Sequence, residues 1–459
     1  MKRPFLLICL LAVALALPAS AGAAIPGAPV RHVFTIVLEN ESESSTFGPG
    51  SPAPYLATTL PSEGAFVPNY YGIGHFSNDN YIGMISGQPP NESNELDCST
   101  FSDFPTTATG AYGAQEGTGC VYPPDIQTVA NQLQNASLTW RDYNQDMGAV
   151  PSRDNGTSCA HPPVGSADPT ETGAAADEYA TRHNPFVYFH SIIDNTANCQ
   201  SHVVNLSALQ ADLASSKSTP NYVFITPNLC EDGHNATCAT PGEPGGFAGI
   251  EAFLQKYVPM ITRSAAFKQN GLLIITFDEA ATTDTSNCCG EIAGPSPGLQ
   301  LAGSDDGGGK VGAVLLSPCI KPGTVTQSAY NHYTMLRSVE DIFGLPHLGY
   351  AQLPGETSFG ADIFNKACEP PPVVKVKTAV SKTTITVSWS ATDAAGPGVG
   401  HYTVQVKNGK SWKNLLRSTT KRSTTYKGKH HQSYQFRVLA VDKSGISSAY
   451  ALSKTVKLK

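Results

Sequence analysis

The chain has 459 residues and a net charge of −7, so it has room for two or three domains. Its charge is divided unevenly: residues 1–370 carry 14 Lys and Arg against 35 Asp and Glu, whereas residues 371–459 carry 16 against 2. This distribution argues against nucleic acid as a partner of the acidic part. It allows the basic part to contact cell-wall polymers or another anionic surface, or simply to stay soluble.

The N-terminal segment has the composition of a secretory signal peptide. Residues 1–24 begin with Lys2 and Arg3, continue with an apolar run and end in small residues. The run is too short to span a membrane, and no later stretch qualifies as a transmembrane segment. We therefore expect residues 1–24 to be removed and the protein to be secreted, either extracellular or associated with the cell wall.

The cysteine count agrees with export. Of the 11 cysteines, Cys9 lies in the signal peptide and ten remain, an even number that predicts up to five disulfides. Cys230 and Cys238 are close enough in sequence to close one loop. The adjacent Cys288 and Cys289 are expected to pair with different partners. Without a CxxC spacing, metal binding by thiolates is disfavoured.

Four apolar runs of the buried-strand kind lie in the acidic part: HVFTIVLEN from residue 32, NYVFITPN from 221, GLLIITFDEA from 271 and VGAVLLSPC from 311. Helical patterns lie between and after them, including IEAFLQKYVPMI and TMLRSVEDIFG, the latter with Gly344 as a C-cap. This alternation predicts an α/β domain with a largely parallel central sheet flanked by helices.

Polar residues follow each of these apolar runs. Because ligands of parallel sheets bind beyond the carboxyl ends of the strands, these residues form one candidate site. They are Glu39 and Asn40 after the first run, Asp232 and His234 after the second, Asp278 and Glu279 after the third, and His332 at the start of the helix that follows the fourth. Each alone is most often a turn or cap residue. Together they would repel one another unless cations neutralised them, which predicts one or two divalent metal ions.

The segment GHFSNDNYIGMISGQ supplies a candidate nucleophile at the start of a predicted helix that Gly87 ends. One interpretation is that Ser77 or Asn78 caps the helix. The other is that Ser77 attacks a phosphoryl group, which the N–H groups of the helix N-terminus would receive. In that case a metal ion favours the serine alkoxide, and Asn80 donates its amide N–H to a phosphate oxygen.

The basic C-terminal part alternates in the manner of strands. TTITVSWSA places Ile385, Val387 and Trp389 on one face, and HYTVQVK and YQFRVLAVD follow the same period. Several half-buried strands in so short a segment predict a small all-β sandwich domain. The pattern resembles a fibronectin type III domain. The expected division is a signal peptide (1–24), a catalytic domain (25–367), a Pro-rich linker (368–373) and the sandwich (374–459).

Six segments of the large part carry a family resemblance: HVFTIVLENES, GHFSNDNYIGMISGQPPN, RHNPFVYF, FITPNLCEDGHN, LLIITFDEA and NHYTMLRSVEDIFGLPHLG. In this order they resemble the phosphoesterase family that joins secreted acid phosphatases with bacterial phospholipases C, within the alkaline-phosphatase-like superfamily. The nearer branch looks like the smaller secreted acid phosphatases of mycobacteria and relatives. The resemblance implies an alkaline-phosphatase-like fold for nearly the whole large domain.

The resemblance also implies roles for single residues. Ser77 would be the phosphorylated nucleophile and Asn80 the phosphate donor. Glu39, Asn40, Asp278 and Glu279 would hold one metal with Ser77, and Asp232, His234 and His332 would hold a second. His183 would contact substrate or protonate the leaving group. The oxygen ligands suit Ca²⁺, Mg²⁺ or Mn²⁺, and the Asp/His/His set suits Zn²⁺ or Fe.

Three functions are compatible with these observations. The first is a secreted, metal-dependent phosphoric monoester hydrolase that acts through a phosphoserine intermediate on Ser77. The second is a phosphodiesterase of the phospholipase C type. The third is a cell-wall or glycan-binding protein with an inactive phosphoesterase domain. Loops 89–125 and 144–182 are expected to frame the substrate pocket, and their sequence does not identify the phosphate ester that binds there.

Overall fold

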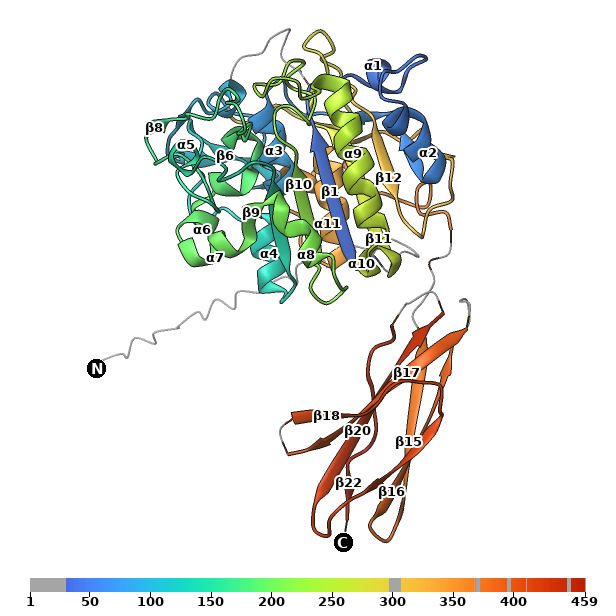
Figure 1. Cartoon of the computed structure of the whole chain (residues 1–459). Helices are drawn as coiled ribbons and strands as arrows, with labels where there is room; N and C mark the ends of the chain where they lie inside the picture. The colour runs from blue at the N-terminus through green and yellow to red at the C-terminus, as the bar shows by residue number, and fades with distance from the viewer. Residues whose placement is uncertain are drawn as a thin grey trace, which may run out of the picture.

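The computed structural model describes residues 30–296, 307–366, 368, 372–393, 398–409, 411–443 and 447–458. The expected signal peptide lies outside these residues. The described residues form an α/β body and a separate all-β region at the C-terminus (Figure 1).

The α/β body is built on one eight-stranded sheet. Its strands are β1 (His32–Leu38), β2 (Ala65–Val67), β7 (Trp140–Asn144), β9 (Val203–Asn205), β10 (Tyr222–Thr226), β11 (Gly271–Phe277), β12 (Ala313–Leu316) and β13 (Thr324–Val325). Their order is β13-β2-β12-β11-β1-β10-β7-β9. The run from β11 to β9 is parallel, whereas β12 is antiparallel to both of its neighbours. The predicted largely parallel sheet is confirmed.

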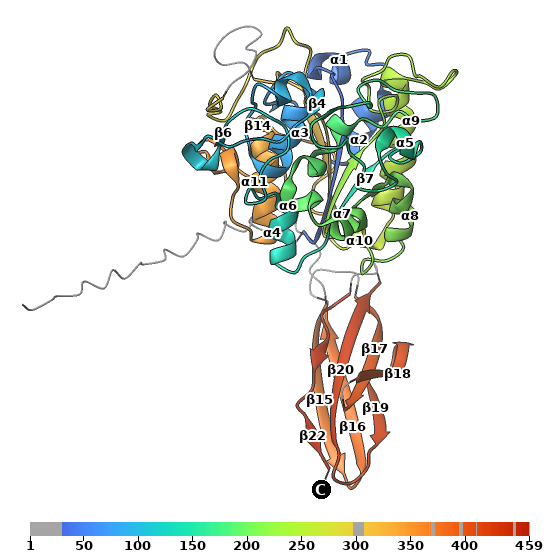
Figure 2. The same ribbon diagram turned by 90° about the vertical axis from the view of Figure 1, so that its left-hand side faces the viewer.

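Helices cover both faces of this sheet. One face carries α9 (Gly246–Thr262), and the other carries α3 (Ser77–Ser86), α4 (Val129–Asn135) and α11 (His332–Phe343), as Figures 1 and 2 show. Because both faces are covered, every residue of β1, β10 and β11 is buried, which explains their continuous apolar sequences. The shorter helices are α1 (Glu43–Phe47), α2 (Leu60–Glu63), α5 (Pro151–Asp154), α6 (His190–Ile193), α7 (Thr196–His202), α8 (Leu209–Asp212) and α10 (Ala265–Lys268).

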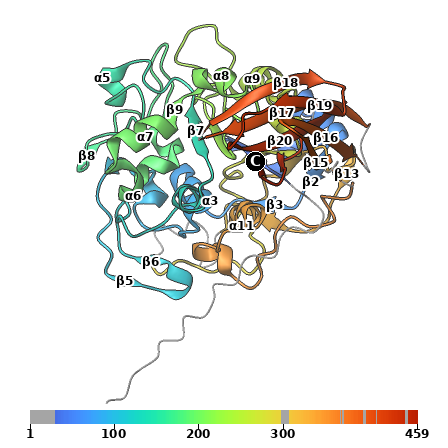
Figure 3. The same cartoon turned by 90° about the horizontal axis from the view of Figure 1, so that it is seen from below.

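Two of the long helices, α3 and α11, pack side by side on the same face of the sheet (Figure 3). Both end at a glycine in the left-handed conformation, with φ of +69° at Gly87 and +68° at Gly344. A side chain with a Cβ is strained at such angles, so these two glycines fix where the helices stop. The predicted C-cap at Gly344 is confirmed.

The C-terminal region contains two antiparallel sheets. One has the order β15-β16-β19, and the other has β18-β17-β20-β21, with β22 also paired to β20. The alternating side chains predicted to face inward, among them Ile385, Val387 and Trp389, are buried between the sheets. The strands are β15 (Val373–Ser381), β16 (Thr384–Thr392), β17 (Val399–Asn408), β18 (Ser411–Thr419), β19 (Ser423–Lys427), β20 (Ser433–Asp442), β21 (Ala451–Leu452) and β22 (Val456–Lys457).

Five disulfides link the ten cysteines of the described residues: Cys98–Cys120, Cys159–Cys199, Cys230–Cys238, Cys288–Cys289 and Cys319–Cys368. The expectation that Cys288 and Cys289 pair with different partners is wrong. The chain turns at Cys289, where φ is +66°, and the two neighbours bond within that turn. Cys368, at the start of the expected linker, is tied to the α/β body.

Among the residues that the structure describes, no helix has both the length and the apolar character needed to cross a membrane.

Candidate active site

Three buried carboxylates lie together at the carboxyl edge of the sheet. Glu39 follows β1, Asp278 follows β11, and Asp232 lies in the loop after β10. Backbone hydrogen bonds join these segments: the Glu39 N–H donates to the Asp232 carbonyl, and the Asp278 N–H donates to the Leu38 carbonyl, each at 2.9 Å. The three carboxylates thus lie together because the parallel strands that precede them end at the same edge of the sheet.

Ser77 directs its hydroxyl into this carboxylate cluster. It is the first residue of α3, and its Oγ donates to Glu39 Oε2 at 2.8 Å. The N-cap position belongs to Phe76, which offers no side-chain cap, and the Asn78 side chain donates to the carbonyl of Arg182. The capping interpretation of Ser77 or Asn78 is therefore wrong, because the helix begins one residue earlier than a Ser77 cap would require and two residues earlier than an Asn78 cap would require.

Two further predicted residues orient the cluster from its edge. The Asn40 backbone N–H donates to Asp278 Oδ1 at 2.9 Å, and its side-chain Nδ2 donates to Glu39 Oε2 at 3.1 Å. The backbone N–H of Glu279 donates to the same Asp278 oxygen at 2.7 Å. One Asp278 oxygen is therefore fixed by two donors, while its Oδ2 has no hydrogen-bond partner.

His183, predicted to contact substrate or protonate the leaving group, lies between two of the carboxylates. Its Nε2 is 3.4 Å from Glu39 Oε1 and its Nδ1 is 3.3 Å from Asp232 Oδ2. The ring stacks on Tyr81 with an interplanar angle of 4°. Burial, followed by the positive charge of Arg182, holds the pKa of His183 well below its usual value. The imidazole is therefore neutral and can offer a nitrogen lone pair.

The structure does not assemble the expected second set of ligands. His332 contacts the backbone carbonyl of Asp278 through Nε2 at 2.6 Å and the Tyr70 hydroxyl through Nδ1 at 3.3 Å. His234 Nε2 lies 3.1 Å from Arg182 Nη2. Among the described residues, Asp232 groups instead with Glu39 and His183, whose ligand atoms all lie within 4.8 Å of one another.

His332 is not reached directly from the end of the fourth apolar run, and its role as a ligand stays a prediction. Because β12 is antiparallel to β11, its carboxyl end lies at the opposite edge of the sheet from Asp278. His332 instead follows the short strand β14 (Tyr330–Asn331), which pairs with β3 (Tyr70–Tyr71) outside the eight-stranded sheet. It starts α11, and both of its ring nitrogens are used in holding the Asp278 backbone and Tyr70.

Asn80, predicted to donate to a phosphate oxygen, makes its hydrogen bonds within its own segment. Its Nδ2 donates to the carbonyls of Gly74 and Phe76, each at 2.9 Å, and to Asp79 Oδ1 at 2.8 Å, while its Oδ1 accepts from the Ile73 N–H at 2.8 Å. The amide is therefore engaged within its own segment. These bonds shape the turn leading into Ser77, and the predicted donation from Asn80 to a phosphate oxygen stays a prediction.

The donor set of the cluster fits a divalent cation. Oxygens of Glu39, Asp232, Asp278 and Glu279, together with both His183 nitrogens, are buried without hydrogen-bond partners. Burial raises the pKa of Glu39 well above its usual value, and the charges of Asp278 and Asp232 raise it further. Unpartnered buried carboxylates that repel one another are costly unless a cation lies among them. The Cys230 and Cys238 sulfurs are also near a carboxylate, that of Glu178, but they are bonded to each other and do not ligate.

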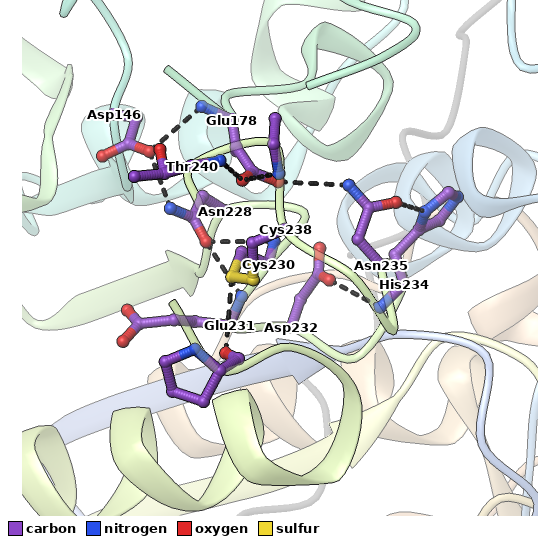
Figure 4. The surroundings of a disulfide bond; sticks show 12 residues. Asp146, Glu178, Asn228, Cys230, Glu231, Asp232, His234, Asn235, Cys238 and Thr240 are labelled. Carbon is purple, nitrogen blue, oxygen red and sulfur yellow. Dashed lines mark hydrogen bonds between the residues drawn. A yellow bond between two sulfur atoms is a disulfide. The ribbon is translucent and has the colours of Figure 1, made fainter. Parts of the chain in front are cut away.

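The loop that carries Asp232 and His234 is fixed by a disulfide and one carboxylate (Figure 4). The predicted Cys230–Cys238 bond closes it. The Glu178 side chain accepts hydrogen bonds from Asn235 Nδ2 at 3.1 Å and from the Ala239 N–H at 2.6 Å. A loop held at both ends keeps the Asp232 side chain beside Glu39 and His183.

Protein free of divalent ions is expected to lose stability as the pH rises. Burial raises the pKa of Asp278 from 3.8 to about 6. A carboxyl group whose pKa is higher in the folded than in the unfolded state takes up protons on folding. Its stabilising contribution is therefore complete below about pH 4 and is lost as the pH rises through about 6. In chelator, we expect the melting temperature to fall between roughly pH 5 and pH 7.5.

Saturating divalent cation is expected to remove most of this fall, because it neutralises the ionised carboxylates. Differential scanning fluorimetry in chelator and in cation, over the same buffers, measures both curves. Curves that stay parallel across the whole pH range would contradict a cation site among these carboxylates.

Two more charged residues lie beside Ser77 and were not singled out by sequence reasoning. Arg182 precedes His183 and has only 3% of its side chain exposed, and Asp97 lies 3.9 Å from its Nε. Burial opposes the charge of Arg182, but the charges of Asp97 and Glu39 raise its pKa above the usual value. The two residues belong to loops 144–182 and 89–125, which were expected to frame the pocket.

Comparison with known proteins points to one family. The profile of the Phosphoesterase family matches residues 50–346. A probable acid phosphatase of Kluyveromyces lactis is 23% identical over 71% of this chain and 61% of its own length. A phosphate-repressible acid phosphatase of Penicillium chrysogenum is 23% identical over 72% of this chain and 65% of its own. The chain thus spans less than two thirds of the length of these fungal relatives.

A bacterial relative has a more similar length. A phosphatidylinositol-3-phosphatase of Mycobacterium tuberculosis is 24% identical over 70% of this chain and 79% of its own length. Among solved structures, an Fn3-like protein of Clostridium thermocellum is 20% identical over 20% of this chain, with a TM-score of 0.16, a value too low to establish a fold.

Proposed function

The chain belongs to the phosphoesterase family, and we propose that it is a secreted, metal-dependent phosphomonoesterase that acts through a phosphoserine intermediate on Ser77. The observation that carries the proposal is the position of the Ser77 hydroxyl. It lies at the N-terminus of a ten-residue helix and donates to Glu39 within a cluster of unpartnered carboxylates. The acid phosphatases among the relatives support hydrolysis of monoesters.

Each residue of the site has a separate role in the proposed reaction. Ser77 Oγ gives its proton to Glu39 Oε2, toward which the hydroxyl donates, and forms a bond to phosphorus. The ester P–O bond breaks, and the leaving oxygen takes up a proton and departs as the alcohol. The N-terminus of α3 stabilises the negative charge of the phosphoryl group. Asn80 holds the turn that presents Ser77. Water then attacks the phosphoserine and releases inorganic phosphate.

One or two divalent cations complete the proposed site. Glu39, Asp278, Glu279 and Asn40 would hold a cation beside Ser77, and Asp232 and His183 supply ligand atoms next to them. When bound, a cation lowers the pKa of the serine hydroxyl and neutralises phosphate oxygens. The mixture of carboxylates and one imidazole is compatible with Ca²⁺, Mg²⁺, Mn²⁺ or Zn²⁺.

Trapping the covalent intermediate tests this mechanism. Protein mixed with an aryl phosphate and quenched in acid within one turnover is expected to carry one added phosphoryl group on the peptide that contains Ser77. Mass spectrometry of the digest locates the group, and the same experiment on Ser77→Ala protein is the control. Full turnover in the wild type with no modified Ser77 peptide at any quench time would rule out the phosphoserine route.

We also propose a role for each remaining part of the chain. Residues 1–24 direct secretion, which the five disulfides support because they persist in oxidising compartments. Residues 25–367 are the catalytic domain, and residues 374–459 are a fibronectin type III-like module. With 16 basic against 2 acidic residues from 371 onward, the module is proposed to attach the enzyme to anionic cell-wall polymers.

A further inference from the structure

The carboxylate of Asp97 lies at the N-terminus of α3, where the proposed reaction needs a phosphoryl group. Its Oδ1 accepts a hydrogen bond from the Asn78 backbone N–H at 3.0 Å, and the Ser77 N–H also interacts with this carboxylate. The segment of the helix offers no cap of its own. Asp97, which comes from the loop after the short helix Asn94–Leu96, therefore acts as the acceptor for these donors.

Arg182 lies beside the same carboxylate. Its Nε lies 3.9 Å from Asp97 Oδ2 and has no hydrogen-bond partner. Its other nitrogens are held in place: Nη1 donates to the Glu171 carbonyl at 3.0 Å, and Nη2 lies 3.1 Å from His234 Nε2. The guanidinium is thus fixed beside the carboxylate that binds the helix N-terminus, with its Nε–H free of any hydrogen-bond partner.

The side chains of Asp97 and Arg182 differ in their exposure to solvent. The Arg182 side chain is 3% exposed, whereas the Asp97 side chain is 24% exposed. If the Asp97 side chain rotates toward solvent, the N–H groups of the helix N-terminus and the Arg182 guanidinium stay in place. Both can then donate hydrogen bonds to another anion. A phosphoryl dianion carries more charge than a carboxylate and has three oxygens to share between them, so it is the stronger ligand for the same donors.

We propose that Asp97 is a displaceable stand-in for the phosphoryl group: its carboxylate fills the anion site formed by the N-terminus of α3 and Arg182, and substrate phosphate replaces it. This inference rests on the proposed function, because it names the residues that compete for and bind the transferred group. When inorganic phosphate leaves, Asp97 returns to the same donors. Asp97 therefore weakens the binding of phosphate and speeds its release.

The test is the affinity for inorganic phosphate in Asp97→Asn protein. Asparagine has the same shape and tolerates the left-handed backbone at this position, where φ is +53°. It lacks the charge that competes with phosphate for the helix and for Arg182. We expect phosphate to bind about tenfold more tightly, as a smaller dissociation constant by calorimetry and a smaller competitive inhibition constant.

Glu92→Gln is the matched control. Glu92 is exposed in the same loop and also carries one negative charge, so its removal changes the net charge equally without touching the site. It is expected to leave phosphate affinity unchanged. If Asp97→Asn does not fold, Asp97→Ser, which shortens the side chain, is measured instead.

Phosphate affinity that is unchanged or weaker in a folded Asp97 variant would overturn the inference and leave Asp97 with only the role of holding Arg182. Calorimetry does not depend on turnover, so this outcome is separate from a failure of the proposed function. That failure would appear as wild-type protein that releases no phosphate from any monoester.

Discussion

Ser77→Ala protein is expected to fold normally and to lose phosphatase activity by about 10⁴-fold or more, the scale seen when a covalent nucleophile is removed. The Ser77 hydroxyl makes one hydrogen bond, to Glu39 Oε2. Its removal leaves the helix and core unchanged, because Phe76 rather than Ser77 holds the N-cap position. The measurement is initial-rate phosphate release from an aryl phosphate, with the melting temperature as the check on folding.

The matched control is Ser86→Ala, at the other end of the same helix. The Ser86 hydroxyl is also buried, but it donates to the Ile82 carbonyl and lies away from the carboxylates. This variant is expected to keep wild-type turnover, even if it loses some stability. If Ser77→Ala retained most of its activity beside a normal control, Ser77 could not be the nucleophile.

Divalent cation is expected to raise the melting temperature of the wild type, and Glu39→Gln is expected to abolish most of that rise. A ligand at about 100 times its dissociation constant stabilises the folded state by roughly 2.7 kcal/mol. Glu39 contacts both Ser77 and His183, so its carboxylate contributes to every part of the cluster. In the absence of cation, the glutamine variant is expected to be at least as stable as the wild type, because it cannot ionise at a position where burial and the neighbouring carboxylates disfavour the charged form of Glu39.

Asp142→Asn is the control: it shows whether the loss of a buried carboxyl group outside the cluster also reduces the stabilisation by cation. Asp142 is fully buried on β7, and burial raises its pKa to about 8, so it is protonated at neutral pH. Its side chain interacts with Asn144 rather than with the cluster. The variant is expected to keep the full cation-dependent rise in melting temperature. A cation shift that survives Glu39→Gln unchanged would place the metal elsewhere.

The sheet and the acidic strand ends could be predicted because both depend on short, local sequence patterns. Continuous apolar runs mark strands covered on both faces, and parallel neighbours bring Glu39, Asp232 and Asp278 to one edge. Strand direction is not encoded in an apolar run. The antiparallel β12 was therefore not predicted, nor was the contact that His332 makes with the Asp278 backbone at the start of its helix.

The rest of the site depends on contacts between loops that sequence spacing does not reveal. His183, Arg182 and Asp97 come from long segments without a periodic pattern, and only folding brings them beside Ser77. Asn80 matched a family motif, but in the structure its side-chain amide donates hydrogen bonds to the turn that precedes Ser77. Motif spacing identified the right segment, but it could not show which way that side chain points.

The most direct test of the central claim is phosphate release from an aryl phosphate monoester, run beside a phosphocholine diester, in chelator and after divalent metals are added back. We expect hydrolysis of the monoester that chelator abolishes and metal restores, with little turnover of the diester. Turnover of the diester alone would contradict the monoesterase assignment and favour the phospholipase C type. No turnover of either ester by folded, metal-loaded protein would contradict catalysis and favour a binding protein with an inactive phosphoesterase domain.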